Sequence, residues 1–488
     1  MHPIKSIFNT LNIPYNFWNV SLFMYVFKDG SGNISNDVEL VDLYIESILE
    51  RKELVLRKAS FGYEDYKVYL ANLAKFLYAH EEQSYSATYR EIIDFTDEYL
   101  QKNPRNNIDA KAVWDYLEDR GILKSCGNNR YTFRLNAIFE YFMSVYLKHD
   151  EGFRREVIAD GRRYLAFANE FEMYAGANRR DEAFLQAIYA KTQAVFATLH
   201  EEFEGLVLDK QMQAAASEIA AQIDKIDLER IQELNQEERD DLEDGMAAAQ
   251  TGGFDRTAEV QVKAQLPLDH TQVDSLERAL QLLGRVYKNA NGIDTNRDLV
   301  YGVFDYLVDT MCKFSFKVFQ DIKDSEMLTT LDKEKAESIL KLLTQLLPVL
   351  VESRLSDVLG TSNFEQMILN RLQELKTAPT HENQLKVFVL SFLLADINLV
   401  KHHTRIAECI EYTTIGILKH CLIMKIMHYL HFAVSDLPMS HQSHIKKELH
   451  AYYMKAKGKF DKPAKNAIGN ALQQMNNRNI VLNAQDAR

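Results

Sequence analysis

Residues 121–135 read GILKSCGNNRYTFRL, and this stretch differs from the rest of the chain because its β-forming residues alternate with polar ones. At its centre stand Gly127, Asn128 and Asn129. Glycine and asparagine adopt the backbone conformations that tight turns require. Two short strands therefore flank a turn. The stretch predicts one short β-hairpin in a chain that otherwise follows helical periodicity.

Three amphipathic patterns precede the hairpin, at residues 65–79, 86–102 and 109–120. In each of them apolar residues recur at spacings of three and four, as they do on one face of a helix. Ser86 and Asp109 begin the second and third patterns, where their side chains can cap free backbone N–H groups. Three helices followed by a hairpin predict a winged-helix domain over residues 61–150.

The third predicted helix has an unfavourable charge for reading DNA. Its sequence, DAKAVWDYLEDR, holds four acidic residues against Lys111 and Arg120. A recognition helix lies among phosphates and usually carries basic side chains. We therefore expect a winged helix that packs against protein, with Trp114 buried on the apolar side of this helix. A winged helix that reads DNA is the alternative.

The residues after the hairpin carry a family resemblance. Residues 131–147, YTFRLNAIFEYFMSVYL, resemble the phrase F-x-H-x-x-F-x-E-Y-F-A-A that closes the winged helix of STAND-class NTPases, particularly of the NACHT-like branch. The matching residues are Phe133, Glu140, Tyr141 and Phe142. Two further phrases resemble the same family, LVDLYIESILERK at residues 40–52 and YLAFANEFEMYAGANRRDEAFL at residues 164–185. The resemblance covers about residues 7–190.

Two departures from the family pattern limit what the resemblance implies. Leu135 stands where the family commonly has a histidine that can contact the nucleotide, and leucine cannot donate that hydrogen bond. The phosphate-binding motif G-x-x-x-x-G-K-[ST] does not occur in the sequence. We therefore expect no catalytic residues and no cofactor in this chain. The NTPase core and the effector domain are expected upstream or in another polypeptide.

Acidic and basic residues are distributed unevenly along the chain, and this distribution suggests its domain organisation. Residues 201–244 hold fifteen acidic against four basic residues, whereas residues 440–488 hold nine basic against three acidic. The expected parts are a helical arm at 1–60, the winged helix at 61–150, a helical region with an acidic linker at 151–268, a C-terminal helical sensor-like domain at 269–455 and a flexible basic tail at 456–488.

The sensor-like domain reads as an α-helical array, either solenoid-like or a bundle, without a short repeat. Its predicted helices span residues 271–288, 298–319, 333–350, 362–375, 382–396, 405–432 and 441–455. The most apolar runs, 387–400 and 415–434, are interrupted by charged residues that include Asp396 and Lys425. A membrane-spanning helix needs about 20 mostly apolar residues. We therefore expect no membrane partner.

Cysteine and histidine do not form a recognisable metal motif. Eight of the fourteen histidines fall between His402 and His450, yet the sequence has neither CxxC nor HExxH. We expect no metal site. Four scattered cysteines are typical of a reducing compartment, so we expect a cytoplasmic protein.

The fold class predicted here is mostly α, with a winged helix followed by a helical array. The family resemblance implies the regulatory and sensor portion of a STAND-type signal-transduction NTPase, which relays binding of a protein or nucleic-acid trigger to the NTPase core. It further implies homo-oligomers on activation and a role in antiviral defence. The alternatives are a winged-helix transcriptional regulator with a helical ligand-binding domain, and a helical scaffold subunit.

Overall fold

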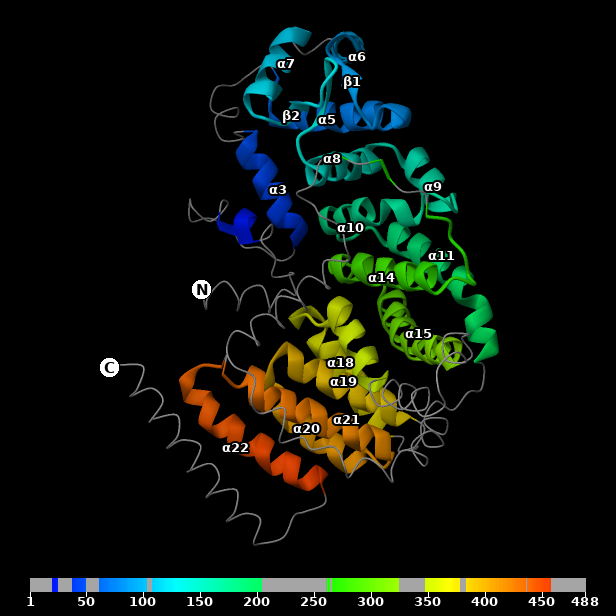
Figure 1. Ribbon diagram of the computed structural model, residues 1–488, viewed down its shortest axis with the longest axis vertical. Coiled ribbons are helices and arrows are strands. Elements are labelled where there is room, and N and C mark those ends of the chain that lie inside the picture. Colours follow the sequence, from blue (N-terminus) through cyan, green and yellow to red (C-terminus); the bar gives the residue numbers. More distant parts are fainter. Residues whose placement is uncertain are drawn as a thin grey trace, which may run out of the picture. The chain divides into compact units, whose positions relative to one another are not determined.

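The structure is a computed structural model. It describes residues 20–24, 37–49, 61–102, 108–203, 260, 262–263, 266–323, 347–377, 383–435 and 437–457. The chain divides into two compact units, the first made of residues 1–201 and 236–307 and the second of residues 202–235 and 308–488. The described residues are mostly helical, with a small three-stranded antiparallel sheet in the first unit (Figure 1). The predicted α-rich fold class is confirmed at this level.

The sheet lies within a compact series of elements in the first unit. In chain order they are α5 (Tyr63–Tyr78), β1 (Ala87–Thr88), α6 (Tyr89–Lys102), α7 (Ala110–Asp119), β2 (Leu123–Ser125), β3 (Arg130–Phe133) and α8 (Asn136–His149). The strands are antiparallel in the order β1-β3-β2, and Leu123 of β2 pairs with Phe133 of β3. The predicted turn is confirmed, because Gly127, Asn128 and Asn129 all have positive φ.

Strand β1 corrects the prediction of an isolated hairpin and of a helix capped by Ser86. Ala87 and Thr88 pair with β3, so α6 begins three residues later, at Tyr89. Thr88 provides the cap, because its N–H donates to Glu91 Oε2 at 2.7 Å and its Oγ1 accepts the Glu91 N–H at 3.3 Å. Ser86 instead donates from Oγ to the Gln83 carbonyl. The sequence pattern did not predict this strand, because two residues are too few to show alternation.

Helix α7 begins and packs as its sequence predicts. Asp109 Oδ1 accepts the Ala112 N–H at 2.7 Å and thereby caps the helix. Trp114 is 5% exposed and meets Tyr89 and Tyr131 edge to face, at centroid distances of 5.0 and 4.7 Å. These contacts bury the apolar side of α7 against α6 and the sheet.

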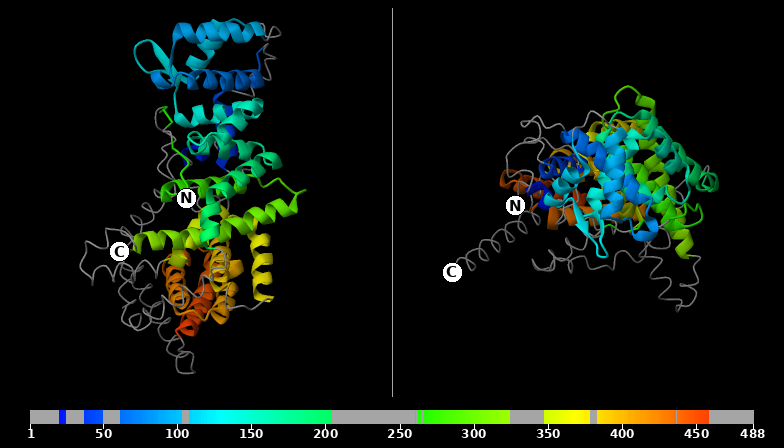
Figure 2. Two further views of the ribbon diagram at one scale, coloured as in Figure 1. Left: turned by 90° about the vertical axis from the view of Figure 1, so that its right-hand side faces the viewer. Right: turned by 90° about the horizontal axis from the view of Figure 1, so that it is seen from above.

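The remaining helices of the first unit build layers next to α8. They are α3 (Asp37–Ile48), α9 (Glu151–Ala159), η2 (Leu165–Phe167), α10 (Ala168–Ala177), α11 (Glu182–Glu202), α14 (Val273–Asn289) and the first part of α15 (Arg297–Lys323). Helix α8 packs against α5 on one side and α10 on the other, and α10 also contacts α3 and α14. The left view of Figure 2 shows the successive layers α5, α8, α10 and α14 from a second direction.

The second unit is a helical array around α19 (Gln384–Ile397). Its other described elements are the end of α15, a helix at 347–359, η4 (Ser362–Phe364), α18 (Glu365–Thr377), α20 (Leu399–Tyr412), α21 (Gly416–His428), the π-helix η6 (Tyr429–Ala433) and α22 (Met439–Ala456). Helix α19 is buried over most of its length and contacts α18, α20 and α21, while α22 covers α20 and α21.

The predicted continuous helix over 405–432 is wrong, because the chain breaks between α20 and α21. The side chain of Gln384 stabilises this break, since its Oε1 accepts the N–H groups of Thr414 at 2.6 Å and Ile415 at 3.1 Å. Apolar periodicity continues through the break, so the pattern concealed it. The predicted helix 333–350 lies outside the described residues up to 346, as do most of the acidic stretch and the tail beyond 457.

Candidate functional site

The four residues of the family phrase divide into two pairs with different environments. Phe133 ends β3 and Phe142 lies on α8; both are fully buried, and their rings stack at a centroid distance of 5.7 Å. They belong to the core of the unit. Glu140 and Tyr141 are adjacent on α8 and only 2% exposed, yet each bears a polar group. Buried polar groups need partners, so these two residues mark the candidate site.

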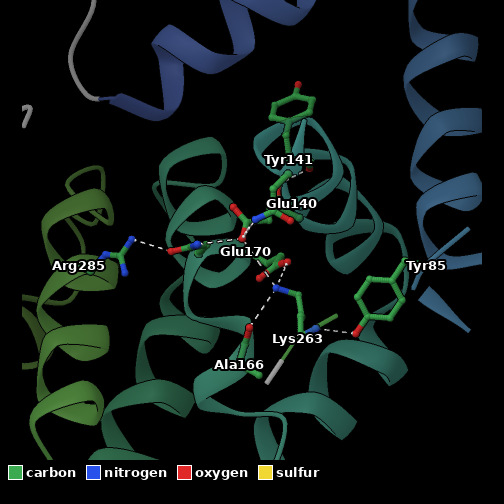
Figure 3. Close-up of polar contacts among 10 residues, drawn as sticks. Tyr85, Glu140, Tyr141, Ala166, Glu170, Lys263 and Arg285 are labelled. Carbon is green, nitrogen blue, oxygen red and sulfur yellow. Dashed lines mark hydrogen bonds and ion pairs between the residues drawn. The ribbon is translucent and has the colours of Figure 1, made fainter. Parts of the chain in front are cut away.

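Glu140 belongs to a buried polar cluster between α8 and α10. Its Oε1 accepts hydrogen bonds from Asn169 Nδ2 at 2.9 Å and from Asn136 Nδ2 at 2.9 Å. The Nζ of Lys263 lies 2.7 Å from Glu170 Oε1 and 3.9 Å from Glu140 Oε1 (Figure 3). We call Glu140, Asn169, Glu170 and Lys263 the Glu140 cluster. One ammonium group thus serves two buried carboxyl groups from neighbouring helices.

The lysine of this cluster comes from a short segment distant in sequence from both helices. The N–H of Lys263 donates to Tyr85 Oη at 3.1 Å, and its Nζ donates to the Ala166 carbonyl at 3.1 Å (Figure 3). Further along, the Leu268 N–H donates to the Gly161 carbonyl at 2.7 Å. The described residues of this segment, 262–263 and 266–268, are therefore held by backbone hydrogen bonds as well as by the charge of Lys263.

Burial governs the proton equilibria of the Glu140 cluster. Burial raises the pKa of Glu170 to about 7, against the opposing effect of the Lys263 charge. Burial by itself would lower the pKa of Lys263, but the carboxylates of Glu170 and Glu140 outweigh it and hold the pKa above its usual value. Glu170 Oε2 has no hydrogen-bond partner in the described part of the chain. Lys263 therefore stays charged, and Glu170 sits near its titration midpoint at neutral pH.

A second ion pair extends the cluster to α14. Arg285 of α14 donates to Glu172 Oε2 and, at 3.0 Å, to Asn169 Oδ1. Asn169 thus links the carboxylate of Glu140 to Arg285, because its amide nitrogen donates to Glu140 and its amide oxygen accepts from Arg285. Helices α8, α10 and α14 are consequently connected through one polar network.

Tyr141 makes the corresponding connection to α3. Its Oη donates to Asp42 Oδ1, which also accepts from Lys67 Nζ of α5 at 2.8 Å. Burial, reinforced by the charge of Asp42, raises the pKa of Tyr141 well above its usual value. The phenol therefore keeps its proton and donates it. Adjacent residues on α8 thus fasten this helix to α3 and α5 and to α10.

The side chains of this site form ion pairs and hydrogen bonds, and these contacts are suited to joining helices. Asn169, Glu170 and Lys263 were not predicted as site residues. Residues 164–185 contain Asn169 and Glu170 within a phrase that resembles the family, and that phrase was the available signal. A single lysine beyond the acidic stretch carries no pattern that could indicate its partner.

The described part of the histidine-rich C-terminal region contains two buried histidines, His402 and His420. His402 lies 3.2 Å from Glu365 Oε1, and burial lowers the pKa of both His402 and His420. Among the residues that the structure describes, no three histidine, cysteine or acidic side chains are arranged to hold a metal ion. No helix within the described ranges is long and apolar enough to cross a bilayer.

Comparison with known families relates one segment of the chain to a known class. Residues 85–143, which run from Tyr85 to α8 and include Glu140 and Tyr141, match the sequence model of the family described as Novel STAND NTPase 4. This match relates the segment to STAND-type proteins. Neither the curated proteins nor the solved structures contain a match to the chain.

Proposed function

We propose that this chain is the regulatory and sensor portion of a STAND-type signal-transduction NTPase, with residues 61–150 as its winged helix. The observation that carries the proposal is the family match over residues 85–143, which begins beside β1 and ends within α8. The order helix, strand, helix, helix, strand, strand from α5 to β3 is that of a winged helix and supports the same assignment.

The contacts of α8 suggest how such a domain relays a signal. Helix α8 bonds to α3 through Tyr141 and to α10 and Lys263 through the Glu140 cluster. A displacement of the Lys263 segment leaves the two buried glutamates without their cation, which is costly. The arrangement of α8 and the binding of that segment are therefore coupled, as a two-state element requires.

The other parts of the proposed switch follow from the family resemblance. The NTPase core lies outside these 488 residues, since the sequence has no phosphate-binding motif of the P-loop type, and the family resemblance implies that the effector does too. The helical array at 269–455 senses the trigger, and activated copies oligomerise. The chain itself is not an enzyme and holds no cofactor. It acts in the cytoplasm, in antiviral defence.

Acidic residues on α7 argue against a DNA-reading regulator. Asp115, Glu118 and Asp119 are exposed on this helix, and phosphates would repel them. The winged helix that we propose therefore contacts protein.

The proposal is tested by asking which polypeptide binds ATP. The P-loop protein encoded in frame with this chain or next to it is produced with and without the chain, and ATP binding is measured by calorimetry. We expect no binding by the chain alone, and binding by the P-loop protein that co-elutes with the chain. Micromolar ATP binding by the chain alone would contradict the assignment.

A further inference from the structure

A cleft of about 680 Å³ opens in the first unit beside Tyr141, on α8. Its walls come from α3, α5, the end of α8 and the turn between α10 and α11. This volume lies within the range of small-molecule sites, about 300–1,000 Å³. The family phrase marks one wall, but none of the contacts described above fills the cleft.

Basic side chains line the cleft, and two of them have no partner. Lys67 is paired with Asp42, and Arg179 with Glu39. Lys148 and Arg180 also line the cleft; both are exposed, and neither side chain forms a hydrogen bond or an ion pair in the described part of the chain. The paired residues balance each other's charges, so the charges that remain in the lining are those of Lys148, Arg180 and Asp181.

The remaining acidic residue of the cleft is already engaged. Asp181 Oδ1 accepts the Phe184 N–H at 2.9 Å, and its Oδ2 accepts the Tyr174 Oη at 2.5 Å. Its charge therefore faces the first turn of α11 and compensates the partial positive charge of that helix end. These hydrogen bonds orient Asp181 but leave its negative charge in place, so the four basic and three acidic residues that line the cleft sum to one net positive charge, which attracts anions.

We propose that this cleft binds a small anionic molecule whose phosphate or carboxylate group is held by Lys148 and Arg180. A guanidinium group offers two parallel N–H donors that match either anion, and an ammonium group adds a mobile point charge. Val38 and Ala177 provide an apolar part of the wall for the remainder of the ligand. The walls enclose a volume suited to a small molecule, which is why we infer this class of ligand.

Occupation of the cleft joins α8 to the turn after α10, next to the contact by which Tyr141 and Asp42 connect α8 with α3. Lys148 belongs to the last turn of α8, whereas Arg180 follows α10, so one anion bound to both fixes these two elements together. Helices α3 and α10 approach each other closely at the wall of the cleft. Glycine at position 176 permits this approach, because a Cβ there would lie 2.6 Å from Val38 Cγ2. This ligand site goes beyond the proposed function and does not depend on it.

The test uses pyrophosphate and citrate as probes on the full chain. Binding is measured by calorimetry at low salt, for the unaltered chain and for the double variant Lys148→Ala/Arg180→Ala. Both side chains are exposed, so their removal should leave the fold intact. The matched control is Arg90→Ala/Lys111→Ala, which removes two exposed basic residues from α6 and α7.

We expect at least one probe to bind and its affinity to fall at least about tenfold in the double variant, since two charge-assisted contacts are lost. The control variant should bind as the unaltered chain does. Preference for pyrophosphate identifies a phosphate site, and preference for citrate a carboxylate site. The proposal is overturned if neither probe binds below about 10 mM, or if the cleft variant and the control lose affinity equally. Neither result depends on a nucleotide-binding partner.

Discussion

The Nζ atom of Lys263 lies 2.7 Å from Oε1 of Glu170, and this contact joins a segment beyond the acidic stretch to a helix that precedes it. Glu170 is fully buried, and the lysine side chain is 12% exposed. Each charged group therefore has the other as its partner, because water has little access to either. This ion pair, together with the hydrogen bonds of Lys263 to Tyr85 and Ala166, holds Lys263 against α8 and α10.

Replacing Lys263 by methionine should destabilise the first unit by about 3–5 kcal/mol, because two buried carboxyl groups lose their cation. The free energy of unfolding can be followed by the fluorescence of Trp114, which is buried in the first unit. The double variant Lys263→Met/Glu170→Gln should recover part of the loss. Lys111→Met is the control on an exposed site. A loss below about 1 kcal/mol would show that the cluster does not hold the segment.

The Glu140 cluster also predicts a pH dependence. Burial raises the pKa of Glu170 to about 7, whereas a glutamate in the unfolded chain titrates near 4.3. The resulting stabilisation is fully present below about pH 4 and is lost as the pH rises through about 7. Between about pH 5 and pH 8, the free energy of unfolding of the unaltered chain should thus fall by on the order of 1–3 kcal/mol relative to that of Glu170→Gln. Parallel stability curves for the two proteins would contradict this prediction.

Removing the Tyr141 hydroxyl should release α3. A hydrogen bond to a charged group contributes about 1.5–3 kcal/mol, so Tyr141→Phe should speed amide hydrogen exchange in α3 at least about tenfold. Exchange in α5 should stay unchanged. Tyr146→Phe is the matched control, because the Tyr146 hydroxyl bonds the nearby Asp150. Equal exchange in α3 for both variants would mean that the Tyr141 contact does not hold this helix.

Trp114 should contribute strongly to the stability of the small domain around the sheet. Its indole is 5% exposed between Tyr89 and Tyr131, so Trp114→Ala should cost about 3–5 kcal/mol. Hydrogen exchange of α7 and β3 measures this cost locally. If protection there falls by less than about 1 kcal/mol, the packing of α7 described above is wrong.

Local patterns in the sequence predicted the elements whose determinants are adjacent in the chain. The turn at Gly127–Asn129 and the Asp109 cap depend on residues within a few positions, and both are present. Strand β1 was missed because it has two residues, and its partner β3 lies on the far side of two helices.

Pairing between distant charges could not be predicted in the same way. Asp396 and Lys425 interrupt two apolar runs, which a sequence shows directly. The structure pairs them at 3.0 Å and adds Glu352 at 2.8 Å from Lys425. The Glu140 cluster follows the same rule, since Lys263 and Glu170 meet only through the tertiary fold. Single charges in apolar surroundings indicate that a partner exists without identifying it.

The central claim is tested most directly by the rate of ATP turnover of a P-loop protein encoded in frame with this chain or next to it, which the proposal requires. It is measured for that protein alone, with the unaltered chain and with the Lys263→Met variant, after both forms of the chain are shown to be folded. A regulatory portion should lower turnover, and loosening the Glu140 cluster should raise it again. Equal turnover in all three samples would contradict the assignment of this chain as the regulatory portion of a STAND-type switch.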